Sequence, residues 1–288
     1  MAWGDRSDGV LLRKLPGFRK MFPFLMRTRT ESVIYYRQRM DLTRTLPWIE
    51  RFNQGRERKC SLFHVILAAS ARTLALRPDA NRFVVGRRIY QRRTIDLSFV
   101  IKRELSESSG ETNLKLTFAP RDTILEVVER VADAVEATRK SGASPDENTS
   151  DMLTRLPRSV LRTVMAGVRA ADYFGLLPAS FIKGDALYTS AYLANLGSIG
   201  IDTLYHHMFE WGNAEFFIVV GKVKKEPVVN DDGVIEVRDV VDVSFSLDER
   251  VTDGVHYART IALLTNLAEN PEKLVQVPGE LPDPFALA

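Results

Sequence analysis

The order of hydrophobic and polar positions along the chain predicts both helices and strands, without a regular alternation of the two. Apolar residues repeat at helical spacing over residues 61–76 and 123–139, and a final helix is predicted over 257–267. Thr123 and Glu126 have the spacing of a capping box, which indicates that the second of these helices begins there.

Alternating or continuously apolar runs predict the strands. They lie at residues 32–42, 94–102, 113–118, 188–193, 215–223 and 242–247. Two hairpins are also predicted, one over 83–90 with Gly86 at its turn and one over 228–240 with Asp232-Gly233 at its turn. Because no strand–helix–strand rhythm is present, we predict an α+β fold in which helices pack on a large mixed β-sheet.

Three further segments leave alternatives open. A short helix is predicted over about 45–52, with Thr43 or Thr45 as its cap. Residues 141–150 (SGASPDENTS) are predicted to be a loop, which is a candidate domain boundary. Residues 152–182 are predicted to be helical, apolar and interspersed with arginine; a helix pair packed on the core or on another subunit is favoured over a helix on a membrane surface.

Composition and charge narrow the class of protein. The 288 residues are 45% hydrophobic and 27% charged, with a formal net charge of +3, which is ordinary for a globular protein and does not favour a nucleic-acid partner. No apolar run approaches the ~20 residues of a membrane-spanning helix, and the first residues lack the apolar core of a secretory signal. We therefore expect a cytoplasmic protein.

The basic residues are concentrated at the N-terminus. Residues 1–60 hold fourteen Lys and Arg against six Asp and Glu, and residues 1–29 form a basic N-terminal arm. The arm is expected either to pack on its own domain or a neighbouring subunit, or to lie on an acidic partner or an anionic membrane surface. The first interpretation is favoured because Pro16, Gly17 and Pro23 interrupt any long amphipathic helix.

Candidate chemistry is sparse. The paired residues His206 and His207 suggest a metal site, but adjacent side chains point in different directions and no spaced third ligand is evident, so a packed aromatic loop is favoured and no metal is expected. Asp248, Glu249 and Arg250 follow a predicted strand, and Asp253 precedes a predicted helix. A carboxylate in such a place suits proton transfer. The residues alone favour a salt-bridged turn instead, in which Arg250 and Asp253 pair with one another or with a distant partner.

Two sequence motifs carry a resemblance to a known family. The run Asp248-Glu249-Arg250-Val251-Thr252-Asp253-Gly254 resembles Asp-His-Arg-x-x-Asp-Gly, and the run Ala194-Asn195-Leu196-Gly197-Ser198-Ile199-Gly200 resembles Ser-Asn-Leu-Gly-x-x-Gly. Both belong to the catalytic domain of the 2-oxoacid dehydrogenase acyltransferases, which shares the chloramphenicol acetyltransferase-like fold. The resemblance extends, more loosely toward the N-terminus, over roughly residues 30–275.

The resemblance implies roles for particular residues. In the family, the motif histidine takes the proton of the attacking thiol, the serine hydroxyl stabilises the oxyanion, and the final aspartate is structural. Glu249 stands in the position of the histidine, and Ala194 in that of the hydroxyl, whereas Asp253 is kept. His256 is an alternative base, and Asn195 and Ser198 complete the expected substrate-binding set with Ala194. A carboxyl in water has a pKa of about 4.3 and a thiol about 8.5, so Glu249 is a poorly matched base.

The function expected from this resemblance is acyl transfer between a coenzyme A thioester and a small acceptor, in a homotrimer or larger homo-oligomer. The alternative is a non-catalytic trimeric scaffold or ligand-binding relative. No lipoyl domain precedes the catalytic region, so no covalent lipoyl group is expected. The predicted layout is a basic arm (1–29), an acyltransferase-like domain (30–275) and a Pro-rich tail (276–288).

Overall fold

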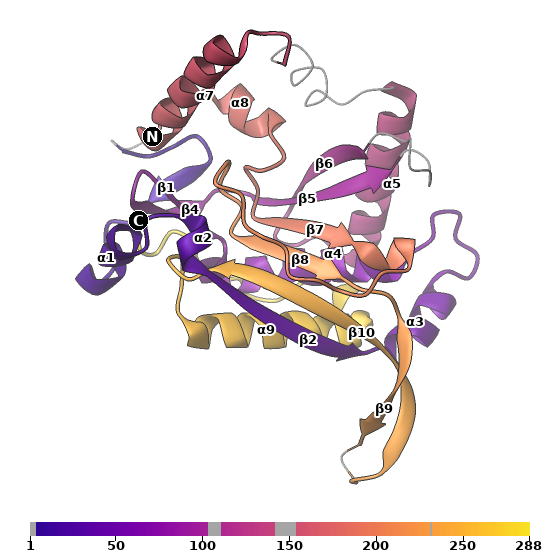
Figure 1. Ribbon diagram of the computed structural model, residues 1–288. Coiled ribbons are helices and arrows are strands. Elements are labelled where there is room, and N and C mark those ends of the chain that lie inside the picture. Colours follow the sequence, from indigo (N-terminus) through magenta and orange to yellow (C-terminus); the bar gives the residue numbers. More distant parts are fainter. Residues whose placement is uncertain (1–3, 103–110, 142–153, 231) are drawn as a thin grey trace.

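The centre of the fold is a seven-stranded mixed sheet, seen in the computed structural model, which describes residues 4–102, 111–141, 154–230 and 232–288 (Figure 1). The strands run in the order β2 (Val33–Asp41), β10 (Ile235–Asp248), β8 (Phe216–Val220), β7 (Ala191–Asn195), β5 (Ile95–Lys102) and β6 (Glu111–Phe118), and β9 (Lys224–Val229) pairs with β10. Among the strand pairs of this sheet, β5–β7 and β7–β8 are parallel and the others are antiparallel. The predicted large mixed sheet is confirmed.

One face of the sheet is covered by helices. α4 (Leu62–Leu76), α5 (Ile124–Ser141) and α9 (Gly254–Glu269) contribute to the main apolar core, together with the inward side chains of the strands. Alternation places Leu97, Leu193 and Phe245 in this core, and their strand neighbours therefore face the other side. Ser61 caps α4 by accepting a hydrogen bond from the backbone N–H of His64.

A smaller sheet lies at the N-terminal side of the molecule. Its order is β1 (Gly9–Leu11), β4 (Arg88–Arg92) and β3 (Arg82–Val85), all antiparallel. The predicted hairpin around Gly86 is therefore confirmed. Part of the basic N-terminal arm, β1, is a paired strand on this hairpin, as expected for an arm that packs on its own chain.

The remaining helices are short or lie at the surface. They are α1 (Gly17–Leu25), α2 (Arg29–Ser32), α3 (Thr45–Phe52), α7 (Arg158–Tyr173) and α8 (Ala179–Gly184), with 3₁₀ turns η1 (Pro78–Ala80), η2 (Leu196–Ile199) and η3 (Pro271–Leu274). The helix pair predicted within 152–182 is present, and α7 has no buried residue. The predicted loop at 141–150 falls almost entirely outside the described residues.

Two details of the prediction are wrong. The predicted hairpin strand and the strand predicted over 242–247 form one continuous strand, β10, because Asp239 and Asp242 pair with cations instead of ending the strand. Neither Thr43 nor Thr45 caps α3: Arg44 precedes the helix, and the Thr45 hydroxyl donates to the carbonyl of Ala268.

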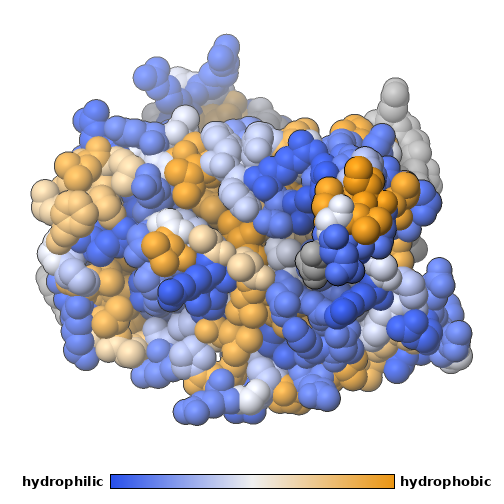
Figure 2. Space-filling view, turned by 90° about the horizontal axis from the view of Figure 1, so that it is seen from below, coloured by the Kyte–Doolittle hydropathy of each residue, from blue (hydrophilic) through white to orange (hydrophobic). Residues whose placement is uncertain are grey.

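Two exposed apolar surfaces stand out in the view from below (Figure 2). One is on α1, where Phe18 and Leu25 are more than half exposed. The other is on the β9–β10 hairpin, where Ile235 and Val237 are about 70% exposed and the strands project away from the sheet (Figure 1). Exposed apolar side chains gathered in this way commonly mark contact surfaces. Across the described segments, no helix has the length and hydropathy needed to cross a membrane.

Candidate functional site

The turn that links β10 to α9 holds the first motif. β10 ends at Asp248, and α9 begins at Gly254 with Asp253 as its N-cap, whose side chain accepts the backbone N–H of His256 at 2.9 Å. Between them, the backbone N–H of Glu249 donates to the carbonyl of Ser32 at 3.0 Å, while the Glu249 side chain is exposed. The predicted strand and helix on either side of this turn are present, and α9 begins three residues before the predicted start at residue 257. Glu249 is presented to solvent from a fixed backbone.

His256 faces two carboxylates. Its Nδ1 lies 2.9 Å from Asp253 Oδ2, and its Nε2 lies 3.3 Å from Asp79 Oδ2. Hydrogen bonds from the backbone and side chain of His256 hold the pKa of the Asp253 carboxyl below its usual range. Since both ring nitrogens are engaged at the helix start, this arrangement favours a positioning role for His256 over that of the alternative base.

A buried ion pair fixes the base of the same turn. Arg250 Nη2 lies 2.6 Å from Asp248 Oδ2, and Arg250 Nε lies 2.9 Å from Asp248 Oδ1, with side chains 5% and 0% exposed. The hydroxyl of Tyr257 on α9 donates to the carbonyl of Asp248 at 2.5 Å. The salt-bridged turn expected from the residues alone is therefore present, but the pair joins Asp248 and Arg250, whereas Asp253 serves as the helix cap.

A second buried carboxyl, which the sequence analysis did not single out, lies beside this pair. Glu215 is 1% exposed; its Oε1 accepts the backbone N–H of Val84 at 3.1 Å, and its Oε2 has no hydrogen-bond partner within the described segments. Burial, followed by the nearby Asp248, raises the pKa of Glu215 to about 8. The only sequence signal was an acidic residue directly before the apolar run Phe216–Val220.

Glu215 is expected to make stability depend on pH. Between its unfolded pKa of 4.5 and its folded-state pKa near 8, this carboxyl takes up a proton on folding. Its contribution to stability is therefore complete below pH 4.5 and is lost as the pH rises toward 8. Relative to Glu215→Gln, the wild type should lose about 1.4 kcal/mol of unfolding free energy per pH unit across this window. Urea unfolding at pH 5 and pH 8 measures this difference, and a constant gap between the two proteins would contradict it.

The second motif follows β7. Ala194 lies on the face of the sheet opposite the helices, since its neighbour Leu193 is in the core. The Asn195 side chain then caps the turn η2 by accepting the backbone N–H of Ser198 at 3.3 Å. The turn packs tightly against the end of β8: a Cβ on Gly197 would lie 2.5 Å from the carbonyl oxygen of Gly221, so only glycine fits there.

The structure does not bring the two motifs together within one chain. Ala194 is level with Val219 of β8 and Ser244 of β10 across the sheet. Glu249 lies five residues beyond Ser244, so the two motif positions are separated by roughly 17 Å along the strands and about 10 Å across two strand spacings. A site that used both groups would have to combine two copies of the chain.

The paired histidines belong to an aromatic stack. The ring of His206 lies parallel to Phe217 with centroids 4.8 Å apart, and the Phe217 ring stacks on Tyr192 at 5.2 Å. Ser246 donates its hydroxyl to the carbonyl of His206, which ties the segment to β10. Within the described residues, no three His, Cys, Asp or Glu side chains are placed to hold a metal ion.

Known acyltransferases resemble this chain in both sequence and structure. A family model described as 2-oxoacid dehydrogenases acyltransferase (catalytic domain) matches residues 188–276, which include both motifs. A probable dihydrolipoamide acetyltransferase from Listeria monocytogenes has a similar structure, with a TM-score of 0.60, 17% identity, and coverage of 93% of this chain and 97% of that one. The chain has an acyltransferase fold. No curated protein sequence matches it.

Two further solved structures share this acyltransferase fold. The cubic core of a pyruvate dehydrogenase multienzyme complex matches with a TM-score of 0.60, 15% identity, and coverage of 94% of this chain and 95% of that one. A chloramphenicol acetyltransferase matches with a TM-score of 0.55, 13% identity, and coverage of 91% and 98%. The predicted resemblance is thus confirmed at the level of the fold.

Within the acyltransferase fold, the hydroxyls near Ala194 are already engaged. Ser198 Oγ donates to the carbonyl of Asn195 at 2.7 Å, Thr189 Oγ1 donates to the carbonyl of Asp96 at 2.7 Å, and Ser190 Oγ accepts the backbone N–H of Asp96 at 3.0 Å. None of these three takes the place of a hydroxyl at position 194. The chain therefore has the fold and the structural residues of both motifs, and it differs from the motifs at Ala194 and Glu249.

Proposed function

We propose that this chain transfers an acyl group from a coenzyme A thioester to a small acceptor, with Glu249 as the base. The observation that carries the proposal is the placement of Glu249. It is an exposed carboxylate at a strand end that is fixed by the Asp248–Arg250 pair on one side and by the Asp253 helix cap on the other. A rigid frame of this kind supplies the positioning that acyl transfer needs.

The proposed reaction has three steps. Glu249 takes the proton from the nucleophilic atom of the acceptor as that atom attacks the thioester carbonyl. The tetrahedral oxyanion then collapses with loss of the coenzyme A thiolate. Finally, Glu249 returns the proton to the thiolate, so that the carboxylate is regenerated.

Oxyanion stabilisation is the weaker part of this site. With alanine at position 194, the chain lacks the side-chain donor that the fold offers there, and the absence of such a donor typically costs about 3 kcal/mol of transition-state stabilisation. Asn195 and Ser198 are proposed to contact substrate near this turn. Ser198 is exposed there, although its hydroxyl proton is directed at Asn195.

We also propose that the active assembly is a homo-oligomer, with a trimer as the expected form. The separation of the two motifs within one chain supports this, because only a second copy could place an Ala194 turn near Glu249. The projecting β9–β10 hairpin offers an apolar surface for such a contact. One similar structure, the cubic core of a pyruvate dehydrogenase multienzyme complex, is itself an assembly, which supports this proposal.

The alternative is a non-catalytic relative that binds a ligand or supports an assembly. Its specific support is the replacement of both chemical groups, Glu249 in one motif and Ala194 in the other, while the structural residues Asp253, Gly197 and Gly254 are kept. In this case Glu249 would be a recognition carboxylate.

Binding of coenzyme A separates the proposal from an unrelated function. Isothermal titration is expected to show coenzyme A binding to the wild type, with a dissociation constant that changes less than about threefold in Glu249→His, because Glu249 acts on the reacting atoms and holds no phosphate. Glu50→His, at an exposed position on α3, is the matched control. If the wild type does not bind coenzyme A, or if mass photometry finds only monomer, the corresponding proposal fails.

A further inference from the structure

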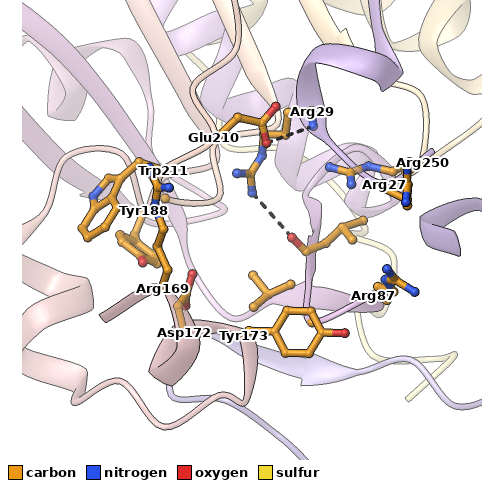
Figure 3. Close-up of a pocket in the computed structure, with 14 residues that line it drawn as sticks. Arg27, Arg29, Arg87, Arg169, Asp172, Tyr173, Tyr188, Glu210, Trp211 and Arg250 are labelled. Carbon is orange, nitrogen blue, oxygen red and sulfur yellow. Dashed lines mark hydrogen bonds between the residues drawn. The ribbon is translucent and has the colours of Figure 1, made fainter. Parts of the chain in front are cut away.

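A cavity rich in arginine lies apart from the Ala194 turn. Its volume is about 290 Å³, and it is lined by the turn between β3 and β4, the end of α7, residues 210–212, and the start of α2 (Figure 3). Five arginines line it: Arg27, Arg29, Arg87, Arg169 and Arg250. These residues come from four separate places in the sequence, so no single sequence motif predicted the cavity.

The carboxylates of this cavity are already engaged. Asp172 lies 2.9 Å from the guanidinium of Arg6, which is outside the cavity lining. Glu210 accepts the backbone N–H groups of Arg29 and Thr30 at 3.3 and 2.8 Å. Arg250, in turn, is paired with Asp248. Within the described parts of the chain, the guanidinium groups of Arg27, Arg87 and Arg169 form no ion pair. The charge of Arg29 is partly offset by the nearby carboxyls of Glu210 and Glu215, and the cavity keeps an excess of positive charge.

Arg29 is the most informative of these residues. It is only 6% exposed, and it donates to two carbonyl oxygens, those of Phe209 at 3.3 Å and Val84 at 3.5 Å. Its Nε is buried without a hydrogen-bond partner in the described part of the chain. Figure 3 shows its side chain in the middle of the cavity, between Trp211 on one side and Arg250 on the other. The carboxyls of Glu210 and Glu215 lie close enough to interact with this charge, but they leave Nε without a hydrogen bond, which an anion in the cavity could supply.

The walls of the cavity are built by close backbone contacts. A Cβ on Gly86 would lie 2.2 Å from the carbonyl oxygen of Tyr173, and a Cβ on Gly212 would lie 2.3 Å from that of Leu187. The β3–β4 turn is thereby held against the end of α7. The next residue, Arg87, has φ of +57°, a left-handed conformation that a residue other than glycine rarely adopts. Arginine at this turn position is therefore kept at a conformational cost.

We propose that this cavity binds a small phosphorylated compound with at least two negative charges. Guanidinium groups hold phosphate oxygens in bidentate geometry, and the three that form no ion pair, Arg27, Arg87 and Arg169, exceed what one carboxylate ligand would neutralise. The volume lies at the lower end of small-molecule sites and suits a diphosphate or a compact sugar phosphate. Tyr173 and Trp211 supply an apolar wall beside the charged groups. This site does not depend on the proposed acyl transfer.

Inorganic pyrophosphate is the probe for this site. Titration of the full chain, followed by calorimetry and by the fluorescence of Trp211 on the cavity wall, should show saturable binding that weakens as salt is added. Arg169→Gln and Arg87→Gly should each raise the dissociation constant about tenfold, because each removes a charge-assisted contact. Arg162→Gln, two turns earlier on α7 and outside the cavity lining, is the matched control and should change it less than twofold.

Arg87→Gly also separates a binding role from a structural one. Glycine accepts a left-handed conformation without strain, so this variant should unfold at a temperature equal to or above that of the wild type while it binds pyrophosphate more weakly. Coenzyme A distinguishes the source of the phosphates: competition with pyrophosphate assigns the site to a nucleotide diphosphate, and binding of pyrophosphate without competition assigns it to a free phosphorylated compound. Absence of pyrophosphate binding, or an equal loss in Arg162→Gln, would overturn the proposal.

Discussion

Replacing Glu249 with glutamine is expected to lower the rate constant kcat of acyl transfer by at least about 100-fold. A positioned general base typically contributes roughly 10²- to 10⁴-fold, and glutamine keeps the size and polarity of the side chain while it removes the proton acceptor. The fold should be unaffected, since the Glu249 side chain is exposed and its backbone N–H still donates to Ser32. Steady-state transfer from an acyl-coenzyme A to a thiol acceptor measures the change.

The control variants make this result specific. Glu50→Gln removes an exposed carboxylate on α3 and should leave kcat unchanged. Glu249→His should raise kcat about tenfold or more near pH 7, because imidazole is a better matched base for a thiol than a carboxylate. Equal rates in the wild type and Glu249→Gln would exclude Glu249 as the base. Absence of transfer in the wild type, with retained ligand binding, would instead favour the non-catalytic alternative.

Replacing Arg250 with glutamine is expected to reduce the free energy of unfolding by about 3–5 kcal/mol. The substitution leaves the Asp248 carboxylate buried at 0% exposure beside the buried carboxyl of Glu215, without its cation. Loss of one member of a buried ion pair usually carries this cost, because the remaining charge is desolvated and unpaired. Urea denaturation at pH 7, followed by circular dichroism, measures the shift of the transition.

The matched control for this substitution is Arg238→Gln. Arg238 also pairs with an aspartate, at 2.6 Å from Asp41, but both side chains are more than a quarter exposed. An exposed pair of this kind should contribute less than about 1 kcal/mol. Equal destabilisation by the two substitutions would mean that burial does not determine the strength of the Asp248–Arg250 pair.

The elements that the sequence predicted correctly are those with a strong local signal. α4 and α5 have long apolar repeats and capping residues, and β5 alternates clearly between apolar and polar residues. β10 was divided in the prediction because Asp239 and Asp242 interrupt its apolar pattern. Those charges are tolerated because Lys225 pairs with Asp239, and because Asp242 pairs with Lys224 of β9 and with two arginines of β2. Single-sequence periodicity does not contain these contacts.

In the candidate site, too, the features set by sequence neighbours could be predicted, and the features set by tertiary contacts could not. The end of the strand near Asp248 and the helix that follows Asp253 depend on residues that are neighbours in sequence, and both were predicted; the capping role of Asp253 was not. The separation of Ala194 from Glu249 is set by the register of three strands, and the burial of Glu215 is set by packing against Val84. The arginine cavity likewise depends on tertiary contacts between segments as distant as residues 27 and 250.

The pairing of β2 with β10 has a consequence for how the chain folds. Val33 pairs with Asp248 and Asp41 with Val240, so this edge of the sheet closes a loop of about 200 residues. During synthesis at roughly 5–20 residues per second, β2 would wait for about 10–40 seconds before its partner leaves the ribosome. Over that interval β2 is an unpaired strand that other chains can pair with. The arginines Arg37 and Arg39 on β2, which later pair with Asp242, supply repulsion between nascent chains at the stage when the strand is most exposed to aggregation.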